Sequence, residues 1–464
     1  MNSRCTTTLR LRRKQRRLLS GIALTIMPLA AFCASWQAEA RPPQVASAPS
    51  DIQAAKLLQY QGASSCAAAA CHNAGHPHGL SGSEHRIWFS HDQHARAYAV
   101  LTTQRSQIIE RNYRGSVAGN TPKAEADTTC LKCHALAPEL AGTAQAHLNL
   151  DGVSCERCHG RAEKWLAIHY LSGWRDKTGY EKRQYGMTLT ADLAARAKLC
   201  AECHIGTPDN DLNHDLYAAG HPPLYYEYSA FLGSMPKHWN EREEKRQYPD
   251  FEARVWALGQ IVSAQAALTL LAHRAHDTER PWPEFAEYNC YACHHNLRVG
   301  EPTPAHPARG TPGRLPWNSW FTPLLPSVLD LPNQRPEMGT WRHDLATLRE
   351  EMEKPLPRRA LVYEQANRIT SQLAQALHGL DGAKLDVASL EALDRTLQSQ
   401  SSVFPPTDWE GLTQVYLARA ALYRARKDLE GGYTGTALRR QLEDLRRRLE
   451  LPFGFRSRAD GTGR

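Results

Sequence analysis

Apolar residues recur at steps of three and four in the last third of the chain, which predicts amphipathic helices. One such face consists of Val362, Ala366, Ile369, Leu373, Leu377 and Leu380. A second consists of Leu412, Tyr416 and Leu422, and a third of Leu438, Leu442, Leu445 and Leu449. Thr407 and Glu410 have the spacing of a capping box at the start of the second helix. The pattern therefore predicts a helical bundle over residues 340–452, with a solvated arginine-rich face. It predicts a tail over residues 453–464.

The apolar pattern is thin between residues 60 and 298, and strand signals are scarce there. The exception is 251–276, where one long helix is predicted by Val255, Leu258, Ile261, Val262, Leu268 and Leu271. Nine prolines within 300–336 exclude a long helix and indicate a linker over 299–339. The expected fold class is mainly α, with short helices and long loops in 60–298 ahead of the bundle.

Residues 1–40 have the three parts of a secretory signal peptide. The basic start contains Arg10, Arg12, Arg13, Lys14, Arg16 and Arg17. An apolar stretch over 18–34 and the cleavage signal Ala38-Glu39-Ala40 follow. We expect a mature periplasmic chain that begins near Arg41, with a flexible lead-in over 41–59. The alternative is an uncleaved membrane anchor, and we expect no second apolar segment long enough to span a membrane.

The net charge of the chain is +8, from 56 Lys/Arg and 48 Asp/Glu. Seven of the basic residues and one acidic residue lie in the first 40 positions, so the rest holds 49 basic and 47 acidic residues, a net +2. The mean hydropathy of −0.54 is typical of a soluble chain. Because the excess charge belongs to the leader, it gives no indication of a nucleic-acid partner.

Cysteine spacing is the strongest chemical signal. Ten of the 12 cysteines form five close pairs, and the other two lie in the leader. Four pairs have the Cys-x-x-Cys-His pattern of c-type haem attachment, namely Cys130-Cys133-His134, Cys155-Cys158-His159, Cys200-Cys203-His204 and Cys290-Cys293-His294. Two cysteines three positions apart reach both vinyl groups of one porphyrin, and the next residue presents its imidazole to the iron. Disulfides and zinc ribbons are alternatives, but neither requires a histidine after every second cysteine.

A fifth pair has wider spacing. Four alanines separate Cys66 from Cys71, and His72 follows directly. The longer loop can still bring both sulfurs to one haem, so we predict five haems c, with His72 as the fifth proximal ligand. A disulfide or a redox pair is the alternative for this loop. Haems would also supply the apolar volume that the side chains of 60–298 lack.

Three segments carry a family resemblance: WFSHDQHARAY at 88–98, DGVSCERCHG at 151–160 and AAGHPPL at 218–224. Together they resemble the multihaem cytochrome family of the nitrifiers' tetrahaem electron carrier and hydroxylamine oxidoreductase, over roughly 60–298. The resemblance implies haems packed edge to edge, with irons capped by distant histidines. The expected haem count matches neither family member, and the C-terminal helical part has no counterpart to align with.

The resemblance also implies candidates for the distal ligands. It favours His94, His169 and His221, with His214 and His238 as weaker candidates. The alternative for each is a surface or capping histidine. Held in reserve are His147, His273, His276 and His295, together with the thioether of Met187.

Two functions fit these expectations. An electron carrier with two histidines on every iron has no coordination position open to a substrate. A multihaem oxidoreductase acting on a small nitrogen or sulfur compound needs one five-coordinate haem, with an acid or base such as His91, Tyr170 or Tyr226 beside it. We favour the carrier, with redox proteins as partners, no nucleic acid, and membrane contact only through an uncleaved leader.

Overall fold

The computed structural model describes residues 59–75, 82–115, 123–290, 315–317, 320–331, 340–404 and 408–449. The predicted signal peptide, the tail, most of the lead-in and much of the predicted linker lie outside these ranges. Cys293, His294 and the reserve ligand His295 also lie outside them. The chain from Asp51 to Arg464 forms one unit by its internal contacts, and everything below concerns that unit.

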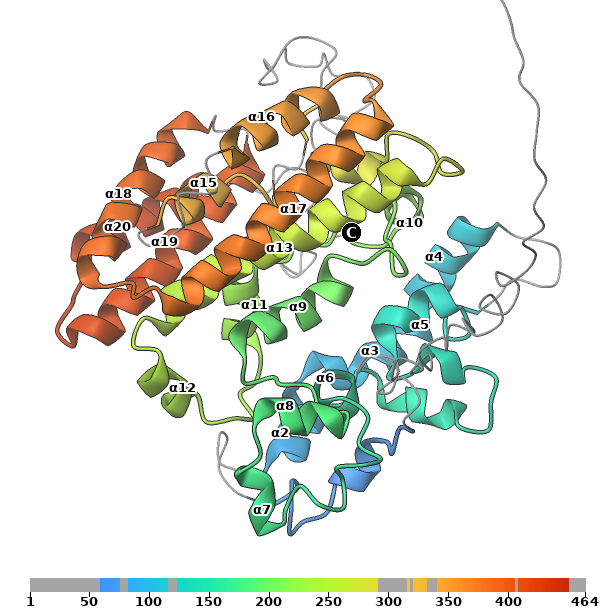
Figure 1. Ribbon diagram of the computed structural model, residues 1–464. Helices are drawn as coiled ribbons and strands as arrows, with labels where there is room; N and C mark the ends of the chain where they lie inside the picture. Colours follow the sequence, from blue (N-terminus) through green and yellow to red (C-terminus); the bar gives the residue numbers. More distant parts are fainter. Residues whose placement is uncertain are drawn as a thin grey trace, which may run out of the picture. The chain divides into compact units, whose positions relative to one another are not determined.

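Short helices joined by loops make up the part before residue 250 (Figure 1). The α-helices are α2 (Glu84–His91), α3 (Ala97–Leu101), α4 (Gln104–Arg114), α5 (Thr128–His134), α6 (Cys155–His159), α7 (Ser172–Arg175), α8 (Gly179–Gln184), α9 (Leu193–His204), α10 (His214–Ala218), α11 (Tyr228–Ser234) and α12 (Glu241–Gln247). The 3-10 turns are η1 (Ala63–Cys66), η2 (Gln93–Arg96), η3 (Pro138–Leu140), η4 (Ala146–Asp151) and η5 (Phe285–Glu287). The described residues contain no strand, so the expected mainly α class is confirmed.

Side-chain caps and attachment motifs set the ends of several short helices. Asp127 accepts a hydrogen bond from the Thr129 amide at the start of α5, and Asp192 accepts one from the Ala195 amide at the start of α9. Helices α5, α6 and α9 end at His134, His159 and His204. Each of these attachment motifs is therefore the final turn of a helix, which directs its two cysteines to one side.

Longer helices form the C-terminal part. They are α13 (Phe251–His276), α15 (Leu325–Leu329), α16 (Trp341–Met352), α17 (Arg359–Gly382), α18 (Val387–Val403), α19 (Trp409–Glu430) and α20 (Thr436–Arg448). The apolar face predicted on α17 is buried, because all six of its residues are at most 6% exposed. The predicted apolar residues of α19 and α20 also lie in helices, as the spacing indicates.

Helix α13 is the central helix of this part and has the bounds that its pattern predicts. It packs along α17 and also contacts α9, α11, α15 and α19. Its length and composition would suffice to cross a membrane, so the expectation of no second such segment is wrong. However, 83% of its apolar window is buried inside the protein. An apolar surface on all sides is what the core helix of a bundle requires.

A buried ion pair fixes the start of α13 to the end of α17. The Arg254 guanidinium donates to the Asp250 carboxylate at 2.9–3.0 Å and to the Leu380 carbonyl at 2.7 Å. Asp250 in turn accepts from the Leu385 amide at 3.0 Å. Helix α13 precedes the predicted linker and α17 follows it. The helical core therefore contains residues from both sides of the linker. The predicted division at 299–339 stays a prediction.

The start of α19 differs from the predicted capping box. The N-cap is Asp408, whose side chain accepts from the Gly411 amide at 2.9 Å, and Thr407 lies outside the described residues. Glu410 instead accepts a hydrogen bond from the Tyr225 hydroxyl at 3.1 Å. The capping-box spacing located the start of the helix to within two residues. It did not predict the hydrogen bond between Tyr225 and Glu410, which connects the bundle to the cysteine-rich part.

Candidate functional site

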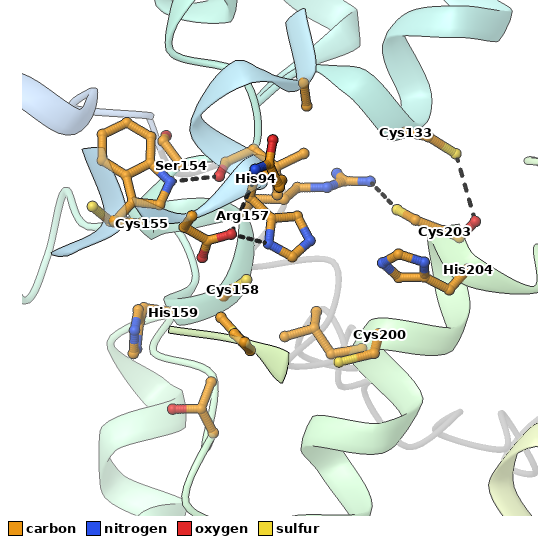
Figure 2. Close-up of a pocket in the computed structure, with 18 of the residues that line it drawn as sticks. His94, Cys133, Ser154, Cys155, Arg157, Cys158, His159, Cys200, Cys203 and His204 are labelled. Atoms are coloured by element: carbon orange, nitrogen blue, oxygen red, sulfur yellow. Dashed lines mark hydrogen bonds and ion pairs between the residues drawn. The ribbon is translucent and has the colours of Figure 1, made fainter. Parts of the chain in front are cut away.

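A cavity of about 1970 Å³ lies among the short helices. Pockets for a single small molecule usually have roughly 300–1,000 Å³, so this chamber has room for several large groups. It is lined by Cys66, Cys71, Cys130, Cys133, Cys155, Cys158, Cys200 and Cys203. Figure 2 shows five of these cysteines around the open space, together with His94, His159 and His204. Four attachment motifs thus open into one chamber.

Eight of the ten histidines that line the chamber lie in four pairs, each joining one motif histidine to one candidate distal histidine. Site A is His72 with His169, site B is His134 with His221, site C is His159 with His238, and site D is His204 with His94. Their ring centroids are 6.0, 6.5, 6.3 and 6.1 Å apart, respectively. A first-row metal lies about 2 Å from an imidazole nitrogen, so two rings on opposite sides of one iron have centroids about 6 Å apart. The pair spacing fits that requirement at all four sites.

Five of these rings have an acceptor beside Nδ1. The acceptor is a carboxylate in two cases: Glu84 lies 2.9 Å from Nδ1 of His72, and Asp92 lies 2.9 Å from Nδ1 of His94. It is a backbone carbonyl for His134, His169 and His221, at 2.7–3.0 Å. Such contacts hold an imidazole in one orientation and leave Nε2 as the nitrogen available to a metal.

Burial is the largest single influence on the pKa of each of the two carboxylates, but the contacts that lower the pKa together outweigh it. Burial alone would raise the pKa of Asp92, but the hydrogen bond with His94 and the charge of that ring lower it below its ordinary value. The pKa of Glu84 is lowered in the same way, through His72 and the Gly82 amide. Both carboxylates are therefore ionised at neutral pH.

Unsatisfied polar atoms around the chamber give an independent test of what it holds. Among the described residues, buried side-chain atoms without a hydrogen-bond partner include Trp165 Nε1 and Arg196 Nη1. Both of these residues line the chamber. Arg157 also lines it and donates to the Lys132 carbonyl at 2.9 Å. A group with an apolar face and acidic edges, as haem has, fits the apolar walls and the two guanidinium groups.

The nine cysteines that the structure describes do not form the arrangements that the alternatives need. None of the nine described cysteines is in a disulfide. The described residues also contain no group of three or more His, Cys, Asp or Glu that could hold a metal ion, which a zinc ribbon requires. Burial raises the pKa of the Cys130 and Cys158 thiols to about 12, so neither is a thiolate at neutral pH.

Contacts between motifs make the four sites neighbours. Cys66 of site A lies within hydrogen-bonding reach of Cys155 of site C, a contact that lowers the pKa of Cys66 to about 6. Cys158 of site C and Cys200 of site D are close enough to interact electrostatically. Cys133 Sγ of site B lies 3.9 Å from the Cys203 carbonyl of site D, and Arg157 of the site C motif donates to the Lys132 carbonyl of the site B motif at 2.9 Å. Site C therefore adjoins sites A, D and B, and sites D and B also adjoin each other.

Glu110 is a buried carboxylate in the chamber wall that the sequence pattern gave no reason to select. Its side chain lies 3.9 Å from Cys130 Sγ, and it is 2% exposed. Burial, and then the neighbouring charge of Asp127, raise the pKa of Glu110 to about 7. The sequence pattern also does not mark Glu84 and Asp92 as residues of the site, although Asp92 lies two positions before the candidate ligand His94.

The other candidate residues lie in various places. The His214 ring packs against Phe285 at a centroid distance of 5.8 Å. Cys290 lines a separate cavity of about 90 Å³ with Tyr225. Because Cys293 and His294 lie outside the described residues, the fifth motif and a role for His214 beside it stay predictions.

The acid–base candidates also differ in position. Tyr226 is buried and stacks on the His204 ring at 5.2 Å, whereas Tyr170 is 71% exposed and contacts the His169 ring. His91 ends α2 and lines the chamber. Met187 lines the chamber and packs with a small apolar cluster around Trp165.

Residues 65–160 match the family model described as cytochrome c554 and c-prime. The match supports a c-type cytochrome that transfers electrons. It covers about a fifth of the chain and includes the motifs that end at His72, His134 and His159. No curated protein and no solved structure matches the chain. The hydroxylamine oxidoreductase side of the resemblance stays an expectation.

Proposed function

We propose that this protein is a periplasmic multihaem c-type cytochrome that passes electrons between neighbouring haems, each held between two histidines. Four haems occupy sites A to D in the chamber. A fifth is attached at Cys290 and Cys293, with His294 as its proximal ligand. The match to a c-type cytochrome family supports the class, and the attachment motifs support the count.

The observation that carries the proposal is the pairing of all four motif histidines in the chamber with a second histidine. Ring separations of 6.0–6.5 Å recur at four sites built from different helices and loops. Chance packing of histidines would not repeat one spacing, or select the histidine that follows each cysteine pair. Four of the five candidate distal ligands take part, including His238, which was one of the two weaker ones.

The chain's residues have separate roles in this proposal. The cysteines would hold each haem covalently, and the paired histidines would hold its iron from both sides. The chamber walls would keep water from the haem, and Arg157 and Arg196 would balance its acidic groups. The haem supplies the one-electron chemistry, while the protein sets orientation and potential.

The adjacency of sites A to D suits transfer between neighbours. Contacts between the motifs would bring haems at adjacent sites close together. With a histidine on each side, a haem at any of these four sites would have no position open to a substrate. Outer-sphere electron transfer is the chemistry that remains there.

Carbon monoxide distinguishes the carrier from an oxidoreductase with several open haems. Bis-histidine ferrous haems do not bind it readily, whereas five-coordinate haems do. We expect the dithionite-reduced holoprotein to retain the absorption spectrum of at least four haems per chain when carbon monoxide is added. Spectral changes at two or more haems would contradict the proposal. Only the fifth haem has no assigned second histidine, so at most one haem should bind carbon monoxide.

A further inference from the structure

The four histidine pairs differ in what lies behind the rings. Site D has an ionised carboxylate, because Asp92 Oδ1 lies 2.9 Å from Nδ1 of His94. Site A also has one, because Glu84 Oε2 lies 2.9 Å from Nδ1 of His72. The acceptors at site B are backbone carbonyls on both sides. At site C, the group that acts on His238 through a hydrogen bond is the backbone of Pro236.

These differences change the electron donation of each imidazole. A ring that donates its N–H to a carboxylate acquires partial imidazolate character and becomes a more basic ligand than one that donates to a carbonyl. A more basic ligand stabilises ferric over ferrous iron, and a buried negative charge nearby acts in the same direction. Each carboxylate should therefore lower the potential of its own haem.

We propose that Asp92 and Glu84 are positioning residues that set the haems of sites D and A to lower reduction potentials than those of sites B and C. This inference rests on the proposed function, since it assumes an iron between the paired histidines. Site C, which adjoins both sites A and D, has the higher potential in each of these neighbouring pairs.

The local structure shows that both carboxylates are built into place. Asp92 is 5% exposed, and its Oδ1 also accepts the His94 amide at 3.0 Å as the N-cap of η2. Glu84 opens α2, and its two carboxylate oxygens accept the Gly82 amide at 2.9–3.0 Å. Each carboxylate is therefore held against the ring by a second backbone contact.

The first test replaces Asp92 with asparagine. The Asp92→Asn side chain keeps an oxygen that can accept both hydrogen bonds, so the cap remains and only the charge is lost. The holoprotein is titrated potentiometrically while the visible and EPR spectra are recorded. We expect the midpoint of one chamber haem to move upward by more than any other midpoint and all low-spin signals to remain.

Asp192→Asn is the matched control. Asp192 caps α9, the helix that carries the site D attachment motif, and accepts the Ala195 amide at 2.9 Å, with its side chain exposed at the surface. It should leave all midpoints unchanged. Glu84→Gln is the second variant, and it should raise the midpoint of a different haem from that raised by Asp92→Asn.

The outcomes separate this inference from the proposed function. Unchanged midpoints with intact low-spin signals in both Asp92→Asn and Glu84→Gln would overturn the tuning role while leaving the carrier in place. Loss of a low-spin signal in Asp92→Asn would also overturn it, because the residue would then act only through structure. A parent protein without four low-spin haems would instead overturn the proposed function itself.

Discussion

Replacing His238 with alanine is expected to turn one low-spin iron per chain into five-coordinate, high-spin iron, with every haem still attached. His238 faces the motif histidine His159 at 6.3 Å in site C, so its loss would leave the iron with one histidine. EPR of the oxidised variant should show a new high-spin signal, and added imidazole should restore the low-spin state.

The control is another histidine in the same chamber. His85 lines the cavity, and its ring packs against Trp88 and Phe89. The His85→Ala variant should keep the spin states of the parent protein. If His238→Ala keeps them as well, His238 is not a ligand and the assignment of site C is wrong.

Replacing both Cys66 and Cys71 with serine is expected to remove one haem from the holoprotein. Both thioether bonds of site A would be lost, and the paired histidines alone do not hold a haem through denaturing mass spectrometry. The mass of the mature protein should fall by one haem group, apart from the small change from sulfur to oxygen. The visible spectrum should lose the corresponding share of its intensity.

The Cys155→Ser/Cys158→Ser variant is the reference for this experiment, because that motif has ordinary spacing. It should also lose one haem. If only this reference variant loses mass, Cys66 and Cys71 do not attach a haem, and the four-residue spacing at this loop has another role.

Local patterns predicted the helices well. The apolar steps of α17 and the full span of α13 correspond to buried helices, because burial against neighbours imposes the period that the sequence displays. The predicted capping residue of α19, Thr407, is wrong, because the N-cap is Asp408. The role of α13 as a core helix shared by both parts was not visible, because its composition alone also fits a membrane span.

The pairing of ligands could not be read from the sequence. His94 faces His204, and His134 faces His221, although about 80–110 residues separate the members of such pairs, and only the tertiary fold brings them together. Resemblance supplied the candidates but not the partners. Asp92 could have been suspected from its place two residues before His94, whereas the contact of Glu84 with His72 depends on how α2 folds back on the first motif.

The spin state of the oxidised holoprotein tests the central claim most directly, because it counts irons held between two histidines. Quantitative EPR should show at least four low-spin ferric centres per chain, one for each facing pair. The rings cross at 74–83° in sites B, C and D and lie within 9° of parallel in site A. Three strongly anisotropic signals and one rhombic signal are therefore expected. Fewer than four low-spin centres per chain would contradict the account.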